Sequence, residues 1–344
     1  MAATQCKAWT FTSGGYPSSL RLSSITPPSK NEVKPNHILV KIQAAALNPV
    51  DIQIMNLPFF SIPLPMFQAE KTICSDFSGT VIQGGEGSGF SEGDEVFGVS
   101  MKPNNPCGGT LSEIAHIDLA SACVVKKPKE WTFREAAGLG CVFLTAKTSI
   151  SKVEDYVQSS SSKRLVVLGG SSACGIYTIL LAKRRGWKVL ATCSGRNADF
   201  VRGTLCADEV VEYTKQNVRE EAKKFKPDAV IDDVGGTECI GLSKRYVTIV
   251  GDKTGRTTMG GPLTYYLSFV PRQWIRWTLG RIGLIESYDV IMLDLKNEYL
   301  EEAKELHKDQ IFIDSTFSME NAKNAYERLN TGRARGKVVV EVAS

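Results

Sequence analysis

The sequence predicts an α/β protein with two domains: an irregular β-rich domain and a doubly wound parallel sheet with helices on both faces. Three observations lead to this fold class. The chain has 344 residues, and a domain usually has about 150. Short β-type segments broken by glycine and proline run from Cys6 to Val125. Beyond residue 163, strand-like and helical segments alternate, which is the pattern of a parallel, doubly wound sheet.

The composition is that of an ordinary folded protein. Hydrophobic residues make up 42% of the chain and charged residues 23%, which excludes collagen, coiled coil and wholesale disorder. Lysine and arginine outnumber aspartate and glutamate by 41 − 37 = 4, and no long run of like charges occurs. We therefore do not expect nucleic acid as a partner.

The nine cysteines are scattered through apolar segments and form no C-x-x-C pair. They are typical of reduced, buried thiols rather than of a disulfide framework or a zinc knuckle. The first residues contain neither an apolar signal core nor an arginine-rich presequence, so we expect a cytoplasmic protein. Residues 165–182 are uncharged, but the glycines among them favour a strand, a turn and a buried helix over a membrane span.

The elements of the β-rich part follow from period-two patterns between turn residues. Strands are predicted within residues 37–47, 76–85, 94–100 and 110–117. Thr132 and Glu135 form a capping box that starts a helix, which we expect to run to Tyr156. A domain boundary is expected near this helix.

The second part repeats strand and helix in order. Strands are predicted at 165–170, 188–194, 209–213, 228–236 and 246–251, and helices at 175–186, 197–205 and 217–226. Near the C-terminus, a helix carries an apolar face, stops at Gly332 and leads into a closing strand at 338–342. The apolar residues of that face are Ala322, Ala325, Tyr326 and Leu329.

A glycine-rich turn joins the first strand and helix of the second part. Gly170, Ser172 and Gly175 match the dinucleotide motif G-x-G-x-x-G, with serine at its middle glycine. Small residues there let the backbone approach a pyrophosphate at the helix N-terminus, where N–H groups and the helix dipole attract anions. The alternative is a tight turn without a ligand, but the surrounding strand–helix series favours the cofactor.

The next strand indicates which cofactor is bound. NAD-binding proteins usually have an acidic residue at its end, which binds the ribose 2′-hydroxyl. Here Thr192, Cys193, Ser194 and Arg196 fill that place, and none of them is a carboxylate. A hydroxyl and a guanidinium suit a 2′-phosphate, so NADPH is predicted. An exposed arginine without a ligand is the alternative for Arg196.

Six ordered motifs carry a resemblance to a known family. They are LNPVDIQI, CSDFSGTVIQGG followed by FSEGDEVFG, GGTLSEIA, FREAAGLGCVFLTA, the glycine turn and TGRARGKVVVEV. Together they resemble the medium-chain dehydrogenase/reductase superfamily over nearly the whole chain. ATCS, VVEYT, DAVIDDVGG and GRARGK are most similar to the zinc-independent quinone oxidoreductases, especially the branch of the reticulon-interacting mitochondrial reductases.

The resemblance implies a GroES-like β-rich catalytic domain, residues 1–130 with 312–344, and a Rossmann NADPH-binding domain, residues 131–311. The closing strand would return to the GroES-like domain. The residues implied at the cofactor and substrate are Ser171, Ala173 and Cys174 at the pyrophosphate, Ser194 and Tyr213 at the 2′-phosphate, Val234 and Gly235 near the nicotinamide ribose, Arg333, Ala334 and Arg335 from the other domain, and Asn48 and Thr145 as catalytic residues beside the nicotinamide and substrate. A buried strand tyrosine is the alternative for Tyr213.

The remaining residues limit the chemistry. Zinc-dependent members hold a catalytic metal through cysteine and histidine, but the position of the first cysteine falls in the motif Asn48-Pro49-Val50-Asp51 and no Gly-His-Glu follows. No metal site is therefore expected, and the predicted reaction is hydride transfer from NADPH to a quinone or an α,β-unsaturated carbonyl. A biosynthetic enoyl reductase for a bulky intermediate and a non-catalytic NADPH-binding sensor are the alternatives. The strand-like segment 288–293 lies where this superfamily often pairs sheets, which suggests a homodimer.

Overall fold

The computed structural model describes residues 5–102, 107–251 and 263–343. Contacts within the chain divide these residues into two compact units, the first made of the described parts of 5–141 and 295–343 and the second of those of 142–294. Residues 131–141 and 295–311 thus group with the first unit, whereas the resemblance assigned them to the second domain. In the second of these segments Asn297 Oδ1 accepts the backbone N–H of Val124 at 3.2 Å.

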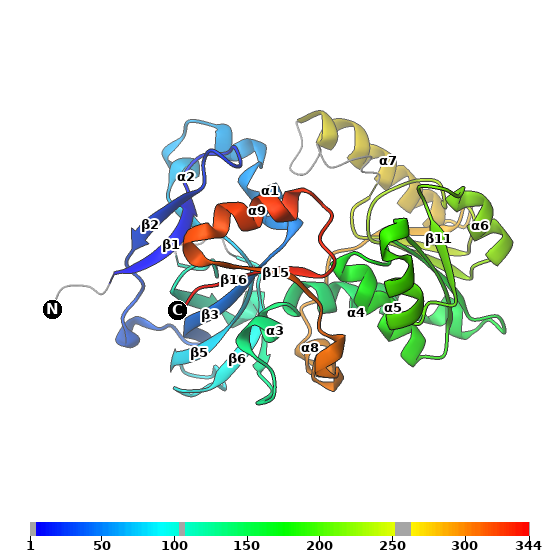
Figure 1. Ribbon diagram of the computed structural model, residues 1–344. Helices are drawn as coiled ribbons and strands as arrows, with labels where there is room; N and C mark the ends of the chain where they lie inside the picture. Colours follow the sequence, from blue (N-terminus) through cyan, green and yellow to red (C-terminus); the bar gives the residue numbers. More distant parts are fainter. Residues whose placement is uncertain (1–4, 103–106, 252–262, 344) are drawn as a thin grey trace. The chain divides into compact units, whose positions relative to one another are not determined.

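The first unit is built around a seven-stranded sheet (Figure 1). Its order is β15 (Ile313–Ser318), β16 (Lys337–Glu341), β3 (His37–Leu47), β5 (Asp76–Gly84), β6 (Glu95–Ser100) and β8 (Ala122–Lys126), with β7 (Ile114–Asp118) also paired to β3. The closing strand β16 pairs antiparallel with β3, Val339 lying opposite Ala46. This confirms that the C-terminal strand returns to the β-rich domain. A three-stranded sheet is formed by β2 (Arg21–Ile25), β1 (Cys6–Phe11) and β4 (Lys71–Thr72).

Helices cover the apolar side of β3 and its neighbours. Helix α9 (Ala322–Asn330) buries Ala322, Ala325 and Tyr326 in the main core cluster of this unit, and Leu329 packs partly buried against it. The predicted apolar face is thereby confirmed. Short helices complete the unit: α1 (Pro49–Met55), α2 (Pro65–Gln68), α3 (Phe133–Ala137) and α8 (Asn297–Glu302).

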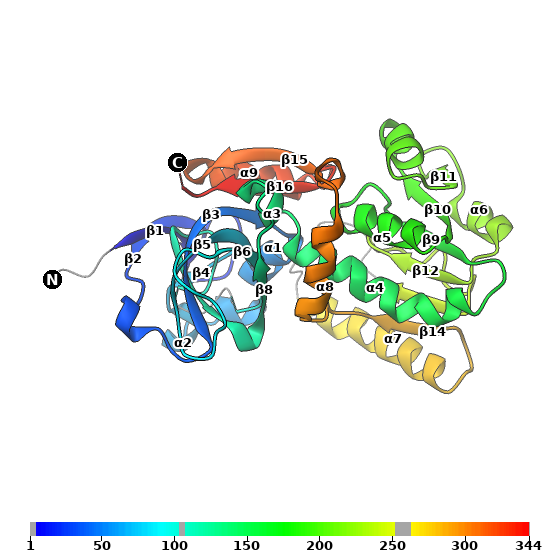
Figure 2. The same cartoon turned by 90° about the horizontal axis from the view of Figure 1, so that it is seen from below.

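The second unit is a six-stranded sheet in which every strand pair is parallel (Figure 2). The order is β11 (Glu209–Glu212), β10 (Lys188–Cys193), β9 (Arg164–Leu168), β12 (Ala229–Asp232), β13 (Arg245–Thr248) and β14 (Ser287–Val290). Numbered within this unit, the strands run 3-2-1-4-5-6, the doubly wound order of Rossmann folds. The predicted fold class is therefore confirmed. The helices of this unit are α4 (Gly140–Gln158), whose first two residues belong to the first unit, α5 (Ala173–Arg184), α6 (Val218–Phe225) and α7 (Leu263–Arg281).

Two predicted helices differ from the structure. The helix expected from Thr132 to Tyr156 starts at its capping box but breaks after α3, and α4 begins at Gly140. A Cβ at Gly140 would lie 2.6 Å from the carbonyl oxygen of Gly98, so the new helix starts where only glycine fits against β6. The helix expected at 197–205 is present but irregular: a 3₁₀ turn at Gly195–Asn197 leads into a π-helical turn at Phe200–Thr204.

No helix in the described part of the chain is long and apolar enough to cross a membrane. The uncharged segment 165–182 is β9, the glycine turn and most of α5, as expected.

Candidate functional site

The strand order of the second unit reverses between β9 and β12. In open parallel sheets, ligands bind outside the carboxyl ends of the strands at such a switch point. The two loops that leave these ends are the glycine turn, residues 169–175, and the turn at 232–235. Both carry residues predicted to bind the cofactor.

The glycine turn depends on close backbone packing. Gly169 has φ +86°, and a Cβ there would lie 2.2 Å from Cγ1 of Val234. A Cβ on Gly175 would lie 2.2 Å from the carbonyl oxygen of Gly169. Neither position accepts a side chain without a backbone shift, so the turn is compact and lies directly against the loop after β12.

Helix α5 begins at the end of this turn. Ser172 is its N-cap, and its hydroxyl oxygen accepts the N–H of Gly175 at 3.0 Å. Serine is among the preferred N-cap residues, which gives a local reason for serine at the position of the middle glycine. Ala173 and Cys174 form the first turn of α5. The positive end of a helix preceded by a glycine turn fits the pyrophosphate of a dinucleotide.

Asn197 links the two segments that were predicted to contact phosphates. Its Nδ2 donates to the hydroxyl oxygen of Ser171 at 2.9 Å and to that of Ser194 at 3.4 Å. The sequence analysis missed Asn197, because it lies in a segment that was predicted to be an ordinary helix. The bridge brings the end of β10 to the glycine turn.

The region after β10 and β11 contains exposed polar groups. Tyr213 is 56% exposed, so it is not a buried strand tyrosine, and its N–H donates to the carbonyl oxygen of Cys193. Arg196 is exposed as well. A carboxylate that sequence reasoning missed also lies here: a Cβ on Gly195 would be 2.5 Å from Oε2 of Glu212. Lys215 Nζ is 2.7 Å from the same oxygen and offsets its charge.

Asp232 shapes the turn after β12. Its Oδ1 accepts the N–H groups of Val234 at 3.1 Å and Gly235 at 2.8 Å, and its Oδ2 accepts the hydroxyls of Tyr246 and Thr248. Burial raises the pKa of Asp232 to about 6, although these hydrogen bonds favour the charged form. The turn holds Gly235 at φ +83° and leaves Val234 52% exposed.

In the first unit, Asn48 belongs to a buried ionic cluster. Its Nδ2 donates to Asp76 Oδ2 at 3.0 Å, and its Oδ1 accepts Lys337 Nζ at 2.6 Å. Lys337 Nζ also lies 2.9 Å from Asp76 Oδ2, with side chains 2% and 0% exposed. Asp76 Oδ1 accepts the N–H of Cys141 in the first turn of α4. Burial is the largest single influence and lowers the pKa of Lys337, but the charge and hydrogen bond of Asp76, together with Cys141 and Asp51, raise the pKa overall. The sequence reasoning missed Asp76 and Lys337.

Asp51 lies beside this cluster. Its Oδ2 accepts the N–H of Asn48 at 2.8 Å, while its Oδ1 is buried and has no hydrogen-bond partner in the described residues. Burial raises the pKa of Asp51 to about 7. Lys337 lowers this pKa and Asp76 raises it.

The other predicted site residues lie in both units. Thr145 is nearly buried on α4 of the second unit, 8% exposed. Arg333 and Arg335 are exposed in the loop before β16, and the N–H of Arg335 donates to Asp314 Oδ1 at 2.9 Å. Ala334 between them is partly buried against the core of the first unit. Their contacts with a cofactor remain predictions.

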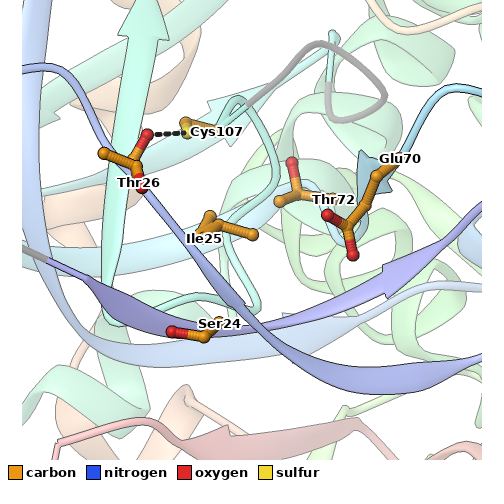
Figure 3. Close-up of a pocket in the computed structure, with 6 residues that line it drawn as sticks. All are labelled: Ser24, Ile25, Thr26, Glu70, Thr72 and Cys107. Carbon is orange, nitrogen blue, oxygen red and sulfur yellow. Dashed lines mark hydrogen bonds between the residues drawn. The ribbon is translucent and has the colours of Figure 1, made fainter.

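Among the described residues, no group of three histidine, cysteine, aspartate or glutamate side chains is placed to hold a metal ion. A cavity of about 320 Å³ in the first unit is lined by residues of β2 and β4, by residues next to these strands, and by Cys107 (Figure 3). The Sγ of Cys107 lies 3.6 Å from the carbonyl oxygen of Thr26. None of the predicted site residues lines this cavity.

Comparisons with known proteins show the family and the fold. The profile of the family "Alcohol dehydrogenase GroES-like domain" matches residues 34–130, and that of "Zinc-binding dehydrogenase" matches residues 205–340. The chain is 30% identical over 356 residues to the trans-enoyl reductase pgmF of Aspergillus terreus, covering 98% of this chain and 96% of the relative. It is also 30% identical over 347 residues to the mitochondrial NAD(P)H oxidoreductase RTN4IP1 of Mus musculus, covering 90% and 82%. The structure of the quinone oxidoreductase from Coxiella burnetii matches with a TM-score of 0.78 at 26% identity, over 99% and 100% of the two chains.

Removing Lys337 should destabilise the first unit strongly. In Lys337→Met, Asp76 keeps a buried charge without its ammonium partner, and we expect a loss of about 3–5 kcal/mol in the free energy of unfolding. Asp76→Asn combined with Lys337→Met removes both charges and should recover most of this loss. Urea unfolding monitored by fluorescence measures the free energy of unfolding of the single and the double variant, and Lys129→Met at an exposed position is the control. A single variant within about 1 kcal/mol of wild type would contradict the role of the pair.

Asp51 should make stability depend on pH. Its pKa is higher in the folded protein, about 7, than its ordinary value of 3.8, so the folded state binds more protons between these values and stability falls as pH rises through them. Asp51→Asn should remove this loss and be more stable than wild type at about pH 8.5, by at most about 4 kcal/mol, with the advantage shrinking toward pH 4. Unfolding at several pH values tests this, with exposed Asp155→Asn as control; a difference independent of pH would refute it.

Proposed function

The chain belongs to the medium-chain dehydrogenase/reductase superfamily, and from this premise we propose that it is an NADPH-dependent reductase of quinones or α,β-unsaturated carbonyls that works without zinc. The observation that carries the proposal is the compact glycine turn at the switch point, with α5 directly behind it and Asn197 joining it to the end of β10. The relatives named as enoyl reductase, NAD(P)H oxidoreductase and quinone oxidoreductase support the same class of reaction.

The chain's own residues have distinct tasks in this reaction. Reduced nicotinamide, when bound, supplies the hydride. The N-terminus of α5 would hold the pyrophosphate, and the Asp232 turn would present Val234 and Gly235 beside the nicotinamide ribose. Holding donor and acceptor in a fixed geometry is the main contribution that a protein makes to hydride transfer. The proton that follows would come from water or a hydroxyl group.

The buried cluster around Asn48 supports a reaction without zinc. Asn48 begins the motif that stands where zinc-dependent members have a cysteine ligand, and its amide is already engaged by Asp76 and Lys337. A lysine ammonium 2.6 Å from the amide oxygen would repel a divalent cation at this place. A substrate activated by conjugation needs no Lewis acid to accept hydride. Asn48 would therefore act by fixing the start of α1 at the substrate rather than by ligating a metal.

The preference for NADPH is supported by the groups after β10 and β11. Ser194, Arg196 and Tyr213 offer a hydroxyl, a guanidinium and a phenol, and the last two side chains are exposed. Glu212 would oppose a 2′-phosphate, but its pairing with Lys215 at 2.7 Å reduces that effect. The balance of charge around this site favours the phosphate.

Oxidation of NADPH and NADH in the presence of ortho-quinones, para-quinones and enones tests the reaction and the cofactor together. We expect turnover with NADPH preferred. Ser194→Asp should raise the KM for NADPH at least about tenfold, because a carboxylate would face the 2′-phosphate, and should change the KM for NADH less.

Ser91→Asp adds the same charge at an exposed position of the first unit and should leave both KM values unchanged. Tight NADPH binding without turnover on any acceptor would reject the reductase and support a sensor. Equal effects of Ser194→Asp on both cofactors would reject the 2′-phosphate site.

We also propose a cytoplasmic homodimer. All nine cysteines are free thiols, as expected in a reducing compartment. In the described residues β14 pairs only with β13, so its other edge offers backbone groups to a second copy. Val290→Pro should remove a backbone donor from that edge and shift the protein toward monomer in sedimentation velocity. An unchanged sedimentation coefficient would place any dimer contact elsewhere.

A further inference from the structure

The outward face of α7 in the second unit exposes a stripe of apolar side chains. We define the α7 face as Arg272, Trp274, Ile275, Thr278, Arg281 and Ile282. Trp274 is 62% exposed, Ile275 58% and Ile282 63%. The hydrogen bond from the N–H of Ile282 to Thr278 continues the helical pattern past Arg281. Large apolar side chains gathered at helical spacing on a surface mark an interaction site rather than isolated exposed residues.

The charge of this segment is one-sided. Between Leu263 and Ile285 the sequence has three arginines and no acidic residue. Arg272 and Arg281 are exposed on the α7 face. The guanidinium of Arg281 lies over the ring of Trp277, 5.1 Å from its centroid, and that ring packs edge-on against Trp274 at 5.6 Å. The face thus combines tryptophan and isoleucine with positive charge, and Leu284 extends it, 69% exposed.

The combination of apolar side chains and positive charge indicates what kind of partner fits the α7 face. A second copy of the chain seated on the same face would bring the arginines of both copies, Arg272 and Arg281 from each, into one interface, since a two-fold interface uses the same patch on both subunits. An anionic partner meets no such repulsion. Tryptophan prefers the boundary between lipid headgroups and acyl chains, and arginine binds lipid phosphates while its stem packs on apolar surface.

We propose that the α7 face binds the surface of an anionic phospholipid membrane, with the helix lying in the interface and its apolar stripe among the headgroups. This geometry is that of interfacial amphipathic helices, and the negatively charged cytoplasmic leaflet provides the lipids. Binding would bring the protein to quinones or enones dissolved in the bilayer. That consequence rests on the proposed function, whereas lipid binding itself does not.

Vesicle sedimentation tests the proposal on the purified full chain without cofactor or substrate, so its outcome is independent of catalysis. The protein should sediment with vesicles of phosphatidylcholine and phosphatidylserine in equal parts, bind vesicles of phosphatidylcholine alone much less, and be released by added NaCl. Trp274→Ser with Ile275→Ser, and separately Arg272→Glu with Arg281→Glu, should each lower the partition coefficient at least about tenfold.

Matched variants separate this face from general effects. Ile62→Ser with Met66→Ser removes two exposed apolar side chains elsewhere, and Lys129→Glu with Lys188→Glu makes the same change of net charge at exposed positions. Both should bind like wild type, and thermal unfolding verifies that every variant is folded.

Equal binding to neutral and anionic vesicles, or equal losses in the matched variants, would overturn the proposal. Sedimentation velocity without lipid tests the alternative that a second copy of the chain covers the α7 face. If the α7 variants turn a dimer into a monomer and the wild-type protein does not bind the vesicles, the face is an interface between two copies.

Discussion

The contact between Lys337 and Asp76 joins more parts of the first unit than any other pair of side chains described above. It connects the C-terminal strand β16 to the start of β5, and through Asp76 it reaches Asn48 at the N-cap of α1 and Cys141 in the first turn of α4. Both charges are removed from water, which costs several kcal/mol per ion before any attraction is gained. The pair is therefore a weak source of net stability. Its main effect is to disfavour other pairings of the C-terminal strand, because any other register of β16 would leave one of the two charges buried without its partner.

This constraint explains why local patterns predicted so much of the fold and less of the site. Strands and helices such as β3, β9, α5 and α9 follow from apolar periodicity and caps, which are short-range signals. The Thr132 capping box was likewise readable, but the break at Gly140 was not, since it comes from a close approach to Gly98 on another strand. Lys337 and Asp76 are 261 residues apart. Nothing in the sequence near either residue shows that they meet.

The predicted cofactor region shows the same difference between local and long-range signals. The glycines and Ser172 could be recognised because backbone geometry demands small residues at fixed spacing. Asn197 could not, because its role is a side-chain bridge between two loops. Glu212 was missed for a different reason. The expected acidic position follows β10, whereas this carboxylate comes from the end of the neighbouring strand β11 and lies close to Gly195. Its charge can only be weighed once Lys215 is placed beside it.

Serine at the middle position of the glycine motif changes how the turn must bind an anion. The Ser172 hydroxyl accepts the N–H of Gly175, so that N–H is satisfied by the protein itself and is not offered to a phosphate. A helix N-terminus attracts anions through such N–H groups and through its dipole. With one N–H engaged, the proposed phosphate binding would rely more on side chains at the rim of the turn. Asn197 would suit this, because it holds the hydroxyls of Ser171 and Ser194, which were predicted at the pyrophosphate and the 2′-phosphate. The serine in the motif and the amide bridge would then act together in the proposed phosphate site.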